Sequence, residues 1–159
     1  MTYIGDVGEV SARTRAAADV EQHTMRAGTI ARFAATGDIT DGRLGVFEWK
    51  MLPRSGGPSP HFHKTFAESF YVISGALGHY DGEHWRESGP GDFLYVPEGG
   101  IHAFRNDSDH PTEMLILFTP GIPREAYFRE LADIASTNRT LSTDEWTELF
   151  ARHDQYRAE

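Results

Sequence analysis

The sequence predicts an all-β domain followed by helices, and three observations carry this prediction. Short segments in which apolar and polar residues alternate recur through the middle of the chain, as in half-buried strands. Turn-forming residues separate these segments, and the 159 residues include 16 glycines. Beyond Pro120 the apolar spacing lengthens to that of a helix. Many short antiparallel strands favour a closed barrel or a jelly roll.

We divide the chain into an N-terminal arm (1–27), a β-barrel (28–120) and a C-terminal helical extension (121–159), together forming one structural domain. The arm is polar and weakly patterned, with a short turn of helix expected around 13–20. Alternation over 43–51 predicts the first clear strand, and a loop rich in Pro and Gly follows it. Further strands are expected at 61–64, 68–74, 76–80, 84–87, 93–97, 102–106 and 112–119.

Local signals define the connections and the helices. Asp81-Gly82 predicts a two-residue type I′ hairpin turn. The run 114–118 is apolar on both faces, which predicts a strand covered on both sides. One helix is expected from Pro123, and a second from the capping box that begins at Ser142. We interpret the aromatic residues of these helices as packing against the outside of the barrel: Tyr127, Phe128, Trp146 and Phe150.

Composition excludes several classes of function. The net charge of −9 argues against a nucleic-acid or acidic-membrane surface, so we expect neither as a partner. The chain has no cysteine, which excludes disulfides and thiolate ligands. No stretch has the length and apolarity of a membrane span, and the first residues lack the pattern of a signal peptide. We therefore expect a cytoplasmic protein.

Two motifs point to a metal site. In the first, His61 and His63 precede Glu68, and Gly75 follows. Residues two apart on a strand point to the same face, so the two imidazoles can meet one ion, with Glu68 on the next strand. The second motif comprises Gly91, Pro97, Gly99, His102 and Asn106. On an adjacent strand, His102 could complete a set of nitrogen and oxygen donors that suits Fe, Mn, Ni, Co or Zn. We expect Asn106 and the glycines to serve the turns.

Together the two motifs resemble those of the cupin superfamily, in the form found in small bacterial monocupins. The resemblance covers 56–106; where the family has a further glycine six residues before His61, this chain has Ser55. It implies the cupin double-stranded β-helix, a jelly-roll barrel with the C-terminal helices packed outside. It also implies that His61, His63, Glu68 and His102 bind one divalent metal, and that the protein is a homodimer.

Five apolar residues are candidates for the substrate pocket, with barrel core as the equally weighted alternative: Trp49, Met51, Phe66, Phe70 and Phe104. Phe70 and Phe104 follow ligand positions by two residues and so share their inward face. The other histidines have no motif support, and we interpret them as lying outside the pocket: His23, His79, His84, His110 and His153.

The resemblance leaves several activities open. With a redox-active metal, the protein would resemble quercetinase-like dioxygenases, and Glu68 would be the catalytic base that takes a substrate proton. With zinc, it would resemble the non-redox cyclases of aromatic polyketide biosynthesis. A sugar isomerase or a small-molecule-binding protein is a further alternative, because Arg54 and Lys64 lie near the ligand strand. We favour a dioxygenase that acts on an aromatic or polyphenolic molecule.

Overall fold

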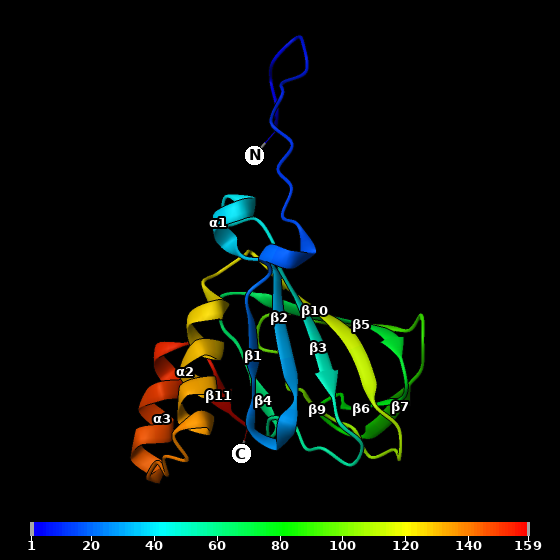
Figure 1. Ribbon diagram of the computed structural model, residues 1–159, viewed down its shortest axis with the longest axis vertical. Helices are drawn as coiled ribbons and strands as arrows, with labels where there is room; N and C mark the ends of the chain where they lie inside the picture. The colour runs from blue at the N-terminus through cyan, green and yellow to red at the C-terminus, as the bar shows by residue number, and fades with distance from the viewer. Residues whose placement is uncertain (1, 159) are drawn as a thin grey trace.

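The computed structural model describes residues 2–158 and confirms the predicted class, a mainly β fold with C-terminal helices (Figure 1). The largest sheet has six strands, in the spatial order β1 (Gln22–Thr24), β2 (Ile30–Ala35), β3 (Gly45–Met51), β10 (Thr112–Thr119), β5 (Ala67–Ser74) and β8 (Phe93–Val96). A three-stranded sheet contains β7 (Trp85–Ser88), β6 (Leu77–Tyr80) and β9 (Ala103–Arg105). A third pairs β11 (Tyr156–Arg157) with β4 (His61–Phe62).

Within residues 2–158, the strands are accompanied by the 3₁₀ helices η1 (Ala17–Asp19) and η2 (Arg26–Gly28). The α-helices are α1 (Gly37–Thr40), α2 (Arg124–Ser136) and α3 (Thr143–Arg152). Figure 1 shows α2 and α3 side by side, against one flank of the barrel. The predicted capping box is confirmed: the Ser142 side chain accepts from the Glu145 amide, and Glu145 accepts from the Ser142 amide. In the described residues, no helix is both long and apolar enough to cross a membrane.

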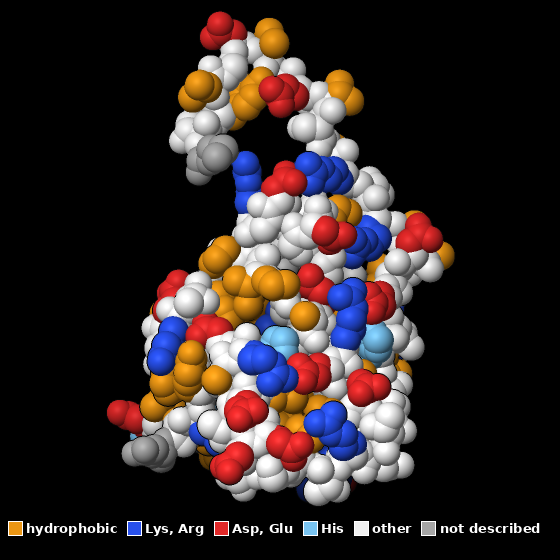
Figure 2. All heavy atoms as spheres, turned by 90° about the vertical axis from the view of Figure 1, so that its left-hand side faces the viewer, with side chains coloured by type: hydrophobic (Ala, Val, Ile, Leu, Met, Phe, Trp, Pro, Cys, Tyr) orange, Lys and Arg blue, Asp and Glu red, His pale blue; other side chains and the backbone are white. Residues whose placement is uncertain are grey.

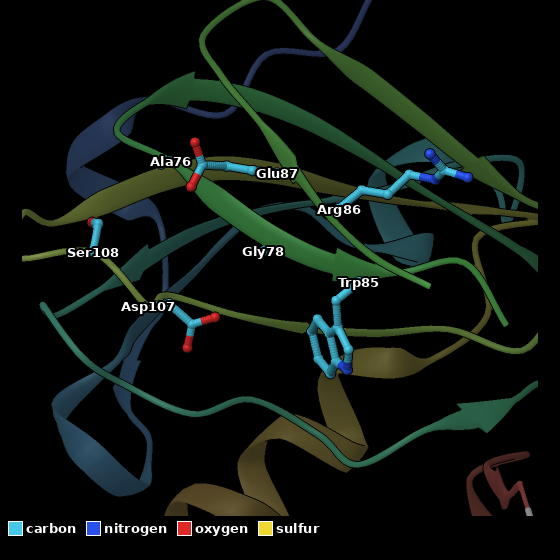
Figure 3. A pocket seen from close by; sticks show the side chains of 7 residues that line it. All are labelled: Ala76, Gly78, Trp85, Arg86, Glu87, Asp107 and Ser108. Atoms are coloured by element: carbon cyan, nitrogen blue, oxygen red, sulfur yellow. The ribbon is translucent and has the colours of Figure 1, made fainter. Parts of the chain in front are cut away.

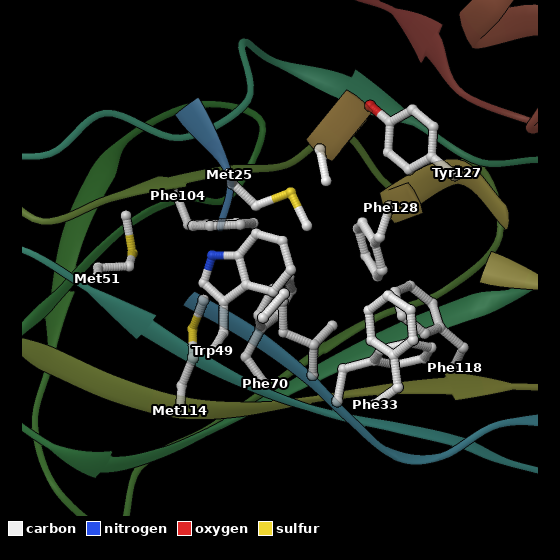
Figure 4. Close-up of a cluster of buried hydrophobic side chains, with 14 of the residues drawn as sticks. Met25, Phe33, Trp49, Met51, Phe70, Phe104, Met114, Phe118, Tyr127 and Phe128 are labelled. Atoms are coloured by element: carbon white, nitrogen blue, oxygen red, sulfur yellow. The ribbon is translucent and has the colours of Figure 1, made fainter. Parts of the chain in front are cut away.

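The core lies between the sheets and reaches under α2 (Figure 4). Alternation along β3 buries Phe47, Trp49 and Met51, as the period-2 pattern predicts. Phe128 of α2 packs against Phe47 at 5.1 Å and Trp49 at 5.0 Å between ring centroids. Burying an aromatic ring of this kind contributes roughly 1.5–3 kcal/mol, so the helix is part of the fold rather than an appendage.

Three local expectations need correction. The turn of helix expected around 13–20 is only the 3₁₀ turn η1. The strand β1 forms within the segment interpreted as an arm, and three mostly polar residues carried no signal for it. The hairpin after β6 is not a type I′ turn of Asp81 and Gly82, because that turn needs a positive φ at both residues and only Gly82 has one. The Asp81 amide donates to the His84 carbonyl at 3.1 Å, and the Asp81 carboxylate accepts from the amides of Glu83 and His84.

Two apolar surfaces remain exposed. The expectation that the run 114–118 is covered on both sides holds only in part, since Leu115 and Leu117 are half-buried. Beside them, the outer faces of β5 and β8 expose large side chains: Tyr71, Ile73, Phe93 and Tyr95. The second surface is the N-terminal arm, which extends away from the body in Figure 1 and exposes Ile4, Val7 and Val10. Figure 2 shows hydrophobic side chains on this projecting part. Elsewhere on that view, acidic and basic side chains are interspersed.

Candidate metal centre

His61, His63, Glu68 and His102 converge at one point inside the barrel. Each offers a donor atom, and these atoms all lie within 4.8 Å of one another. All four side chains are buried, with exposed fractions between 1% and 4%. The sequence motifs therefore bring together the residues that they single out.

Backbone pairing explains the convergence. His61 and His102 form an antiparallel bridge, in which each amide donates to the other's carbonyl at 3.0 and 2.9 Å. The Gly99 amide donates to the His63 carbonyl at 2.7 Å, and Gly99 has a φ of +80° that favours glycine. Glu68 stands near the start of β5, between β10 and β8. Asn106 closes a turn as expected, because its amide donates to the carbonyls of Leu52 and His110.

Each histidine presents Nε2 to the centre because its Nδ1 faces a backbone carbonyl. The acceptors are Ser59 for His61 at 2.8 Å, Asp154 for His63 at 2.6 Å and Gly100 for His102 at 3.0 Å. A carbonyl can only accept, so Nδ1 carries the proton in each ring. The Glu68 Oε2 atom lies 2.9 Å from Nε2 of His63 and 3.0 Å from Nε2 of His102.

The charges of the cluster suit a cation. Burial, followed by the nearby His102, lowers the pKa of His61 to about 3, so this ring is neutral at pH 7. Burial raises the pKa of Glu68, but hydrogen bonds from His102 and His63 outweigh it and hold the pKa well below 4.5. Three imidazoles and one carboxylate, buried together without thiolates, fit a divalent transition metal.

A cavity of about 400 Å³ opens beside the cluster. His61 and Glu68 reach its wall, and so do two of the predicted pocket residues, Trp49 and Phe104. Their rings meet edge to face at 6.5 Å (Figure 4). The cavity is thus continuous with one side of the proposed metal site.

The other three predicted pocket residues, Met51, Phe66 and Phe70, lie outside the lining of this cavity and are fully buried in the core. Phe66 stacks on the His63 ring at 4.2 Å, and Phe70 lies 6.0 Å from the His102 ring. They point inward as predicted, but other side chains separate them from the open space. Here the barrel-core alternative describes their position.

The opposite wall comes from the C-terminal helices, where we expected only packing. The helix aromatics Tyr127, Phe128, Trp146 and Phe150 all line the cavity. Further apolar lining comes from Leu131, Ile134 and Ala135, and Gln155 adds an amide. The apolar stripe of an amphipathic helix has the same residue pattern whether it covers a solid core or borders a cavity. The sequence alone therefore could not distinguish the two arrangements.

The five remaining histidines lie outside both the cluster and the cavity lining. A second, smaller hollow of about 220 Å³ lies on the β6–β7 side of the barrel (Figure 3). It is lined by Trp85, Arg86 and Asp107 among others and contains no member of the cluster. Arg105 covers the Trp85 ring at 3.7 Å. We find no chemistry there comparable to that of the buried site.

Comparison with known proteins relates the middle of the chain to one family. A cupin-domain family model matches residues 47–118, a range that includes all four cluster residues. Over 102 residues the chain is 33% identical to quercetin 2,3-dioxygenase of Bacillus subtilis (strain 168). That match covers 64% of this chain but only 29% of the relative, so the chain spans less than a third of that protein's length.

Solved structures agree on the fold. A sugar phosphate isomerase of the cupin superfamily from Silicibacter pomeroyi superposes with a TM-score of 0.58 at 22% identity, covering 67% of this chain and 75% of that one. The polyketide cyclase RemF from Streptomyces resistomycificus superposes with a TM-score of 0.56 at 19% identity. This match covers 74% of this chain and 93% of that one. At these identities the likeness concerns the fold alone. The family match over residues 47–118 and the likeness in fold support a small cupin.

Proposed function

We propose that this cupin is a metal-dependent dioxygenase acting on an aromatic or polyphenolic small molecule. The observation that carries the proposal is the position of the cluster. The side of the cluster that His61 and Glu68 form opens into a cavity whose walls are largely aromatic. A flat, oxygenated ring system could lie against these walls with one oxygen directed at the site.

The lining of the cavity supports an apolar substrate. Apart from Glu68 and the histidine, the only charged residue in the lining is Arg26. Arg54 and Lys64, the two cations on which the sugar-isomerase alternative depends, interact with residues outside the cavity. Arg54 pairs with Asp109 at 2.8 Å, and the Lys64 ammonium lies 3.8 Å from the centre of the Tyr156 ring. Neither lines the cavity, so neither could hold the phosphate of a sugar phosphate there.

When bound, a redox-active ion such as Fe, Mn, Ni or Co would supply electron transfer between an enolate-type oxygen and O₂. His61, His63, Glu68 and His102 would hold this ion. Glu68 is also our candidate for the catalytic base, because its carboxylate reaches the cavity wall. There it would take the hydroxyl proton of a bound substrate, while the aromatic walls orient the rings and exclude water.

The relative adds independent support for this activity. The quercetin dioxygenase shares a third of the aligned residues, and the aligned length is well over half of this chain. We therefore choose quercetin as the first probe substrate. A related flavonol or catechol would extend the test to the wider polyphenol class.

The experiment combines metal analysis with O₂ uptake. Protein purified without an affinity tag or chelator is analysed for metals, then stripped and reloaded with each candidate ion. We expect stoichiometric binding and quercetin-dependent O₂ uptake with at least one redox-active ion. Glu68→Gln should abolish uptake, whereas His84→Ala, at an exposed histidine, should not. No uptake with any ion and any probe would contradict the proposal.

The same site favours one second candidate, a zinc-dependent non-redox cyclase. Its three imidazoles and one carboxylate suit zinc equally well, and the aromatic cavity would hold a folded polyketide as readily as a flavonol. The two activities separate under strict anaerobiosis. Turnover that persists with zinc and without O₂ would favour the cyclase, and loss of turnover would exclude it.

The homodimer and the cytoplasmic location stay predictions. If a dimer forms, we expect a second copy to cover the exposed face made by Tyr71, Ile73, Phe93 and Tyr95. Light scattering should then give twice the monomer mass of 17.8 kDa. Phe93→Asp, which places a charge in that face, should give the monomer mass. A monomeric native protein would contradict the prediction.

A further inference from the structure

We propose that the turn His153–Gln155, after the last helix, is a positioning element of the metal centre that acts through His63. This inference rests on the proposed metal site. It concerns a segment about 90 residues from the first cupin motif, outside the range matched by the family model. Its test separates the failure of one proposal from the failure of the other.

The three histidines differ in what holds them. His61 and His102 each direct Nδ1 at the carbonyl of the residue two positions earlier, so the backbone just before each histidine orients its ring. His63 instead directs Nδ1 at the carbonyl of Asp154, at 2.6 Å. Its orientation therefore depends on where the C-terminal turn lies.

The Asp154 side chain binds this turn to the loop that follows His63. Its carboxylate accepts from the Lys64 amide at 3.1 Å, from the Thr65 amide at 2.8 Å and from the Thr65 hydroxyl at 2.7 Å. The backbone of Asp154 has a φ of +51°, a conformation that aspartate tolerates better than most residues. The carboxylate thus holds the Asp154 carbonyl against His63.

A buried arginine holds the turn from the other side. Arg124, 3% exposed at the start of α2, donates to the His153 carbonyl at 2.9 Å and to Gln155 Oε1 at 2.5 Å. Its guanidinium lies 3.9 Å from the centre of the Tyr127 ring. The turn is therefore clamped between α2 and the loop after His63, and it has little freedom to shift.

Partners of this kind influence a bound metal. A hydrogen bond to the distal nitrogen of a ligating imidazole sets its tautomer and ring orientation, and losing it typically weakens metal binding 10–100-fold. The neighbouring residue Gln155 lines the substrate cavity. One short turn thus connects the proposed metal site with the proposed substrate site.

The test measures Co²⁺ affinity of the stripped protein by competition with a chromophoric chelator, together with the visible spectrum of the bound ion. Asp154→Ala removes the anchor, and we expect at least about tenfold weaker binding and an altered spectrum. Asp154→Asn keeps an acceptor oxygen and the side-chain size, so it should lose less. This second variant also serves if Asp154→Ala fails to fold.

Asp41→Ala is the matched control. Asp41 also has a positive φ, of +53°, and binds an arginine, but it lies at the end of α1 away from the cluster. We expect it to lower stability without changing affinity or spectrum. Equal losses in Asp41→Ala and Asp154→Ala would overturn the inference.

His63→Ala separates the two proposals. If this variant binds Co²⁺ as tightly as the native protein, the proposed metal site itself is wrong. If it binds weakly while Asp154→Ala and Asp154→Asn match the native affinity and spectrum, the metal site stands and the positioning role of the turn is wrong.

Discussion

The strands that carry the cluster and the helices that follow them contribute differently to one cavity. The barrel side supplies His61 and Glu68, whose donor atoms can reach an ion. The helix side supplies mainly apolar surface, with the Tyr127 hydroxyl and the Gln155 amide as its polar groups. The candidate metal donors therefore come from the barrel, whereas the C-terminal segment adds mainly apolar wall to the cavity.

This division suggests how related cupins can differ. Helical segments packed on a barrel can change the size and form of a cavity without touching the metal donors. One fold can carry many unrelated functional sites. We therefore expect substitutions of the barrel donors to change metal affinity, and substitutions in the helices to change KM for the substrate.

The largest effect is expected on the barrel side, from His102→Ala. Loss of a donor should weaken metal binding by more than about a hundredfold, beyond the usual effect of an outer partner. Competition with a chelator measures the change. His79→Ala is the control, because His79 is also buried but lies outside the cluster. Similar losses in the two variants would mean that general destabilisation, not coordination, explains the result.

On the helix side, Trp146→Ala should change substrate binding and leave the metal in place. Trp146 lines the cavity and packs against Phe150 at 5.3 Å. Losing one aromatic contact of about 1.4 kcal/mol corresponds to a tenfold rise in KM for the probe substrate. Tyr95→Ala removes an exposed ring of β8 that lies outside the cavity lining, and it should leave KM unchanged. Loss of metal from Trp146→Ala would break the proposed division.

A smaller effect is expected from Ser142→Ala, which removes the cap of α3 but no cavity residue. Losing an N-cap typically costs about 1 kcal/mol, and here it should appear in the free energy of unfolding. Urea denaturation of the metal-free protein measures it. Since α3 carries Trp146 and Phe150, a rise in KM with unchanged metal affinity would sharpen the comparison. A change in metal affinity alone would count against it.

The smallest effect concerns the seam between the two regions. Arg129 of α2 donates to both carboxylate oxygens of Glu21 beside β1, at 2.8 and 2.6 Å. This hydrogen bonding lowers the pKa of Glu21 to about 2, against an opposing effect of burial. A lowered native pKa stabilises the fold above pH 4.5, and that stabilisation disappears as the pH falls toward 2.

Glu21→Gln should therefore cost stability at pH 7 and little at pH 2. Both partners are at least 40% exposed, so solvent screening limits the difference to below about 1 kcal/mol. Urea denaturation of both proteins at the two pH values measures it. A difference that persists unchanged at pH 2 would show that the ion pair is not its source.

Some features of the site were predictable because they depend on short spacings. Residues two apart share a face of a strand, so His61 and His63 had to point the same way once that strand formed. The capping box and the inward positions of β3 follow from equally local rules. Likewise, the apolar spacing after Pro123 predicts a helix there, and α2 begins at Arg124.

Other features depend on contacts between distant segments. The placement of Met51, Phe66 and Phe70 in the solid core, and of Trp49 and Phe104 at the cavity, depends on how closely α2 and α3 approach the barrel. The partner of His63 lies 91 residues further along the chain. The short strands β1 and β11 each form by pairing with another strand, β1 with β2 and β11 with β4.

The sequence by itself determined the fold class, because alternation and turn chemistry act over a few residues, and the resemblance of its two motifs to those of cupins implied the four residues that meet at the centre. Only the tertiary structure decided that the C-terminal helices border a cavity, and that the turn after them holds a ligand histidine. Those outcomes depend on packing and on hydrogen bonds between remote parts of the chain, and neither leaves a periodic trace in the sequence.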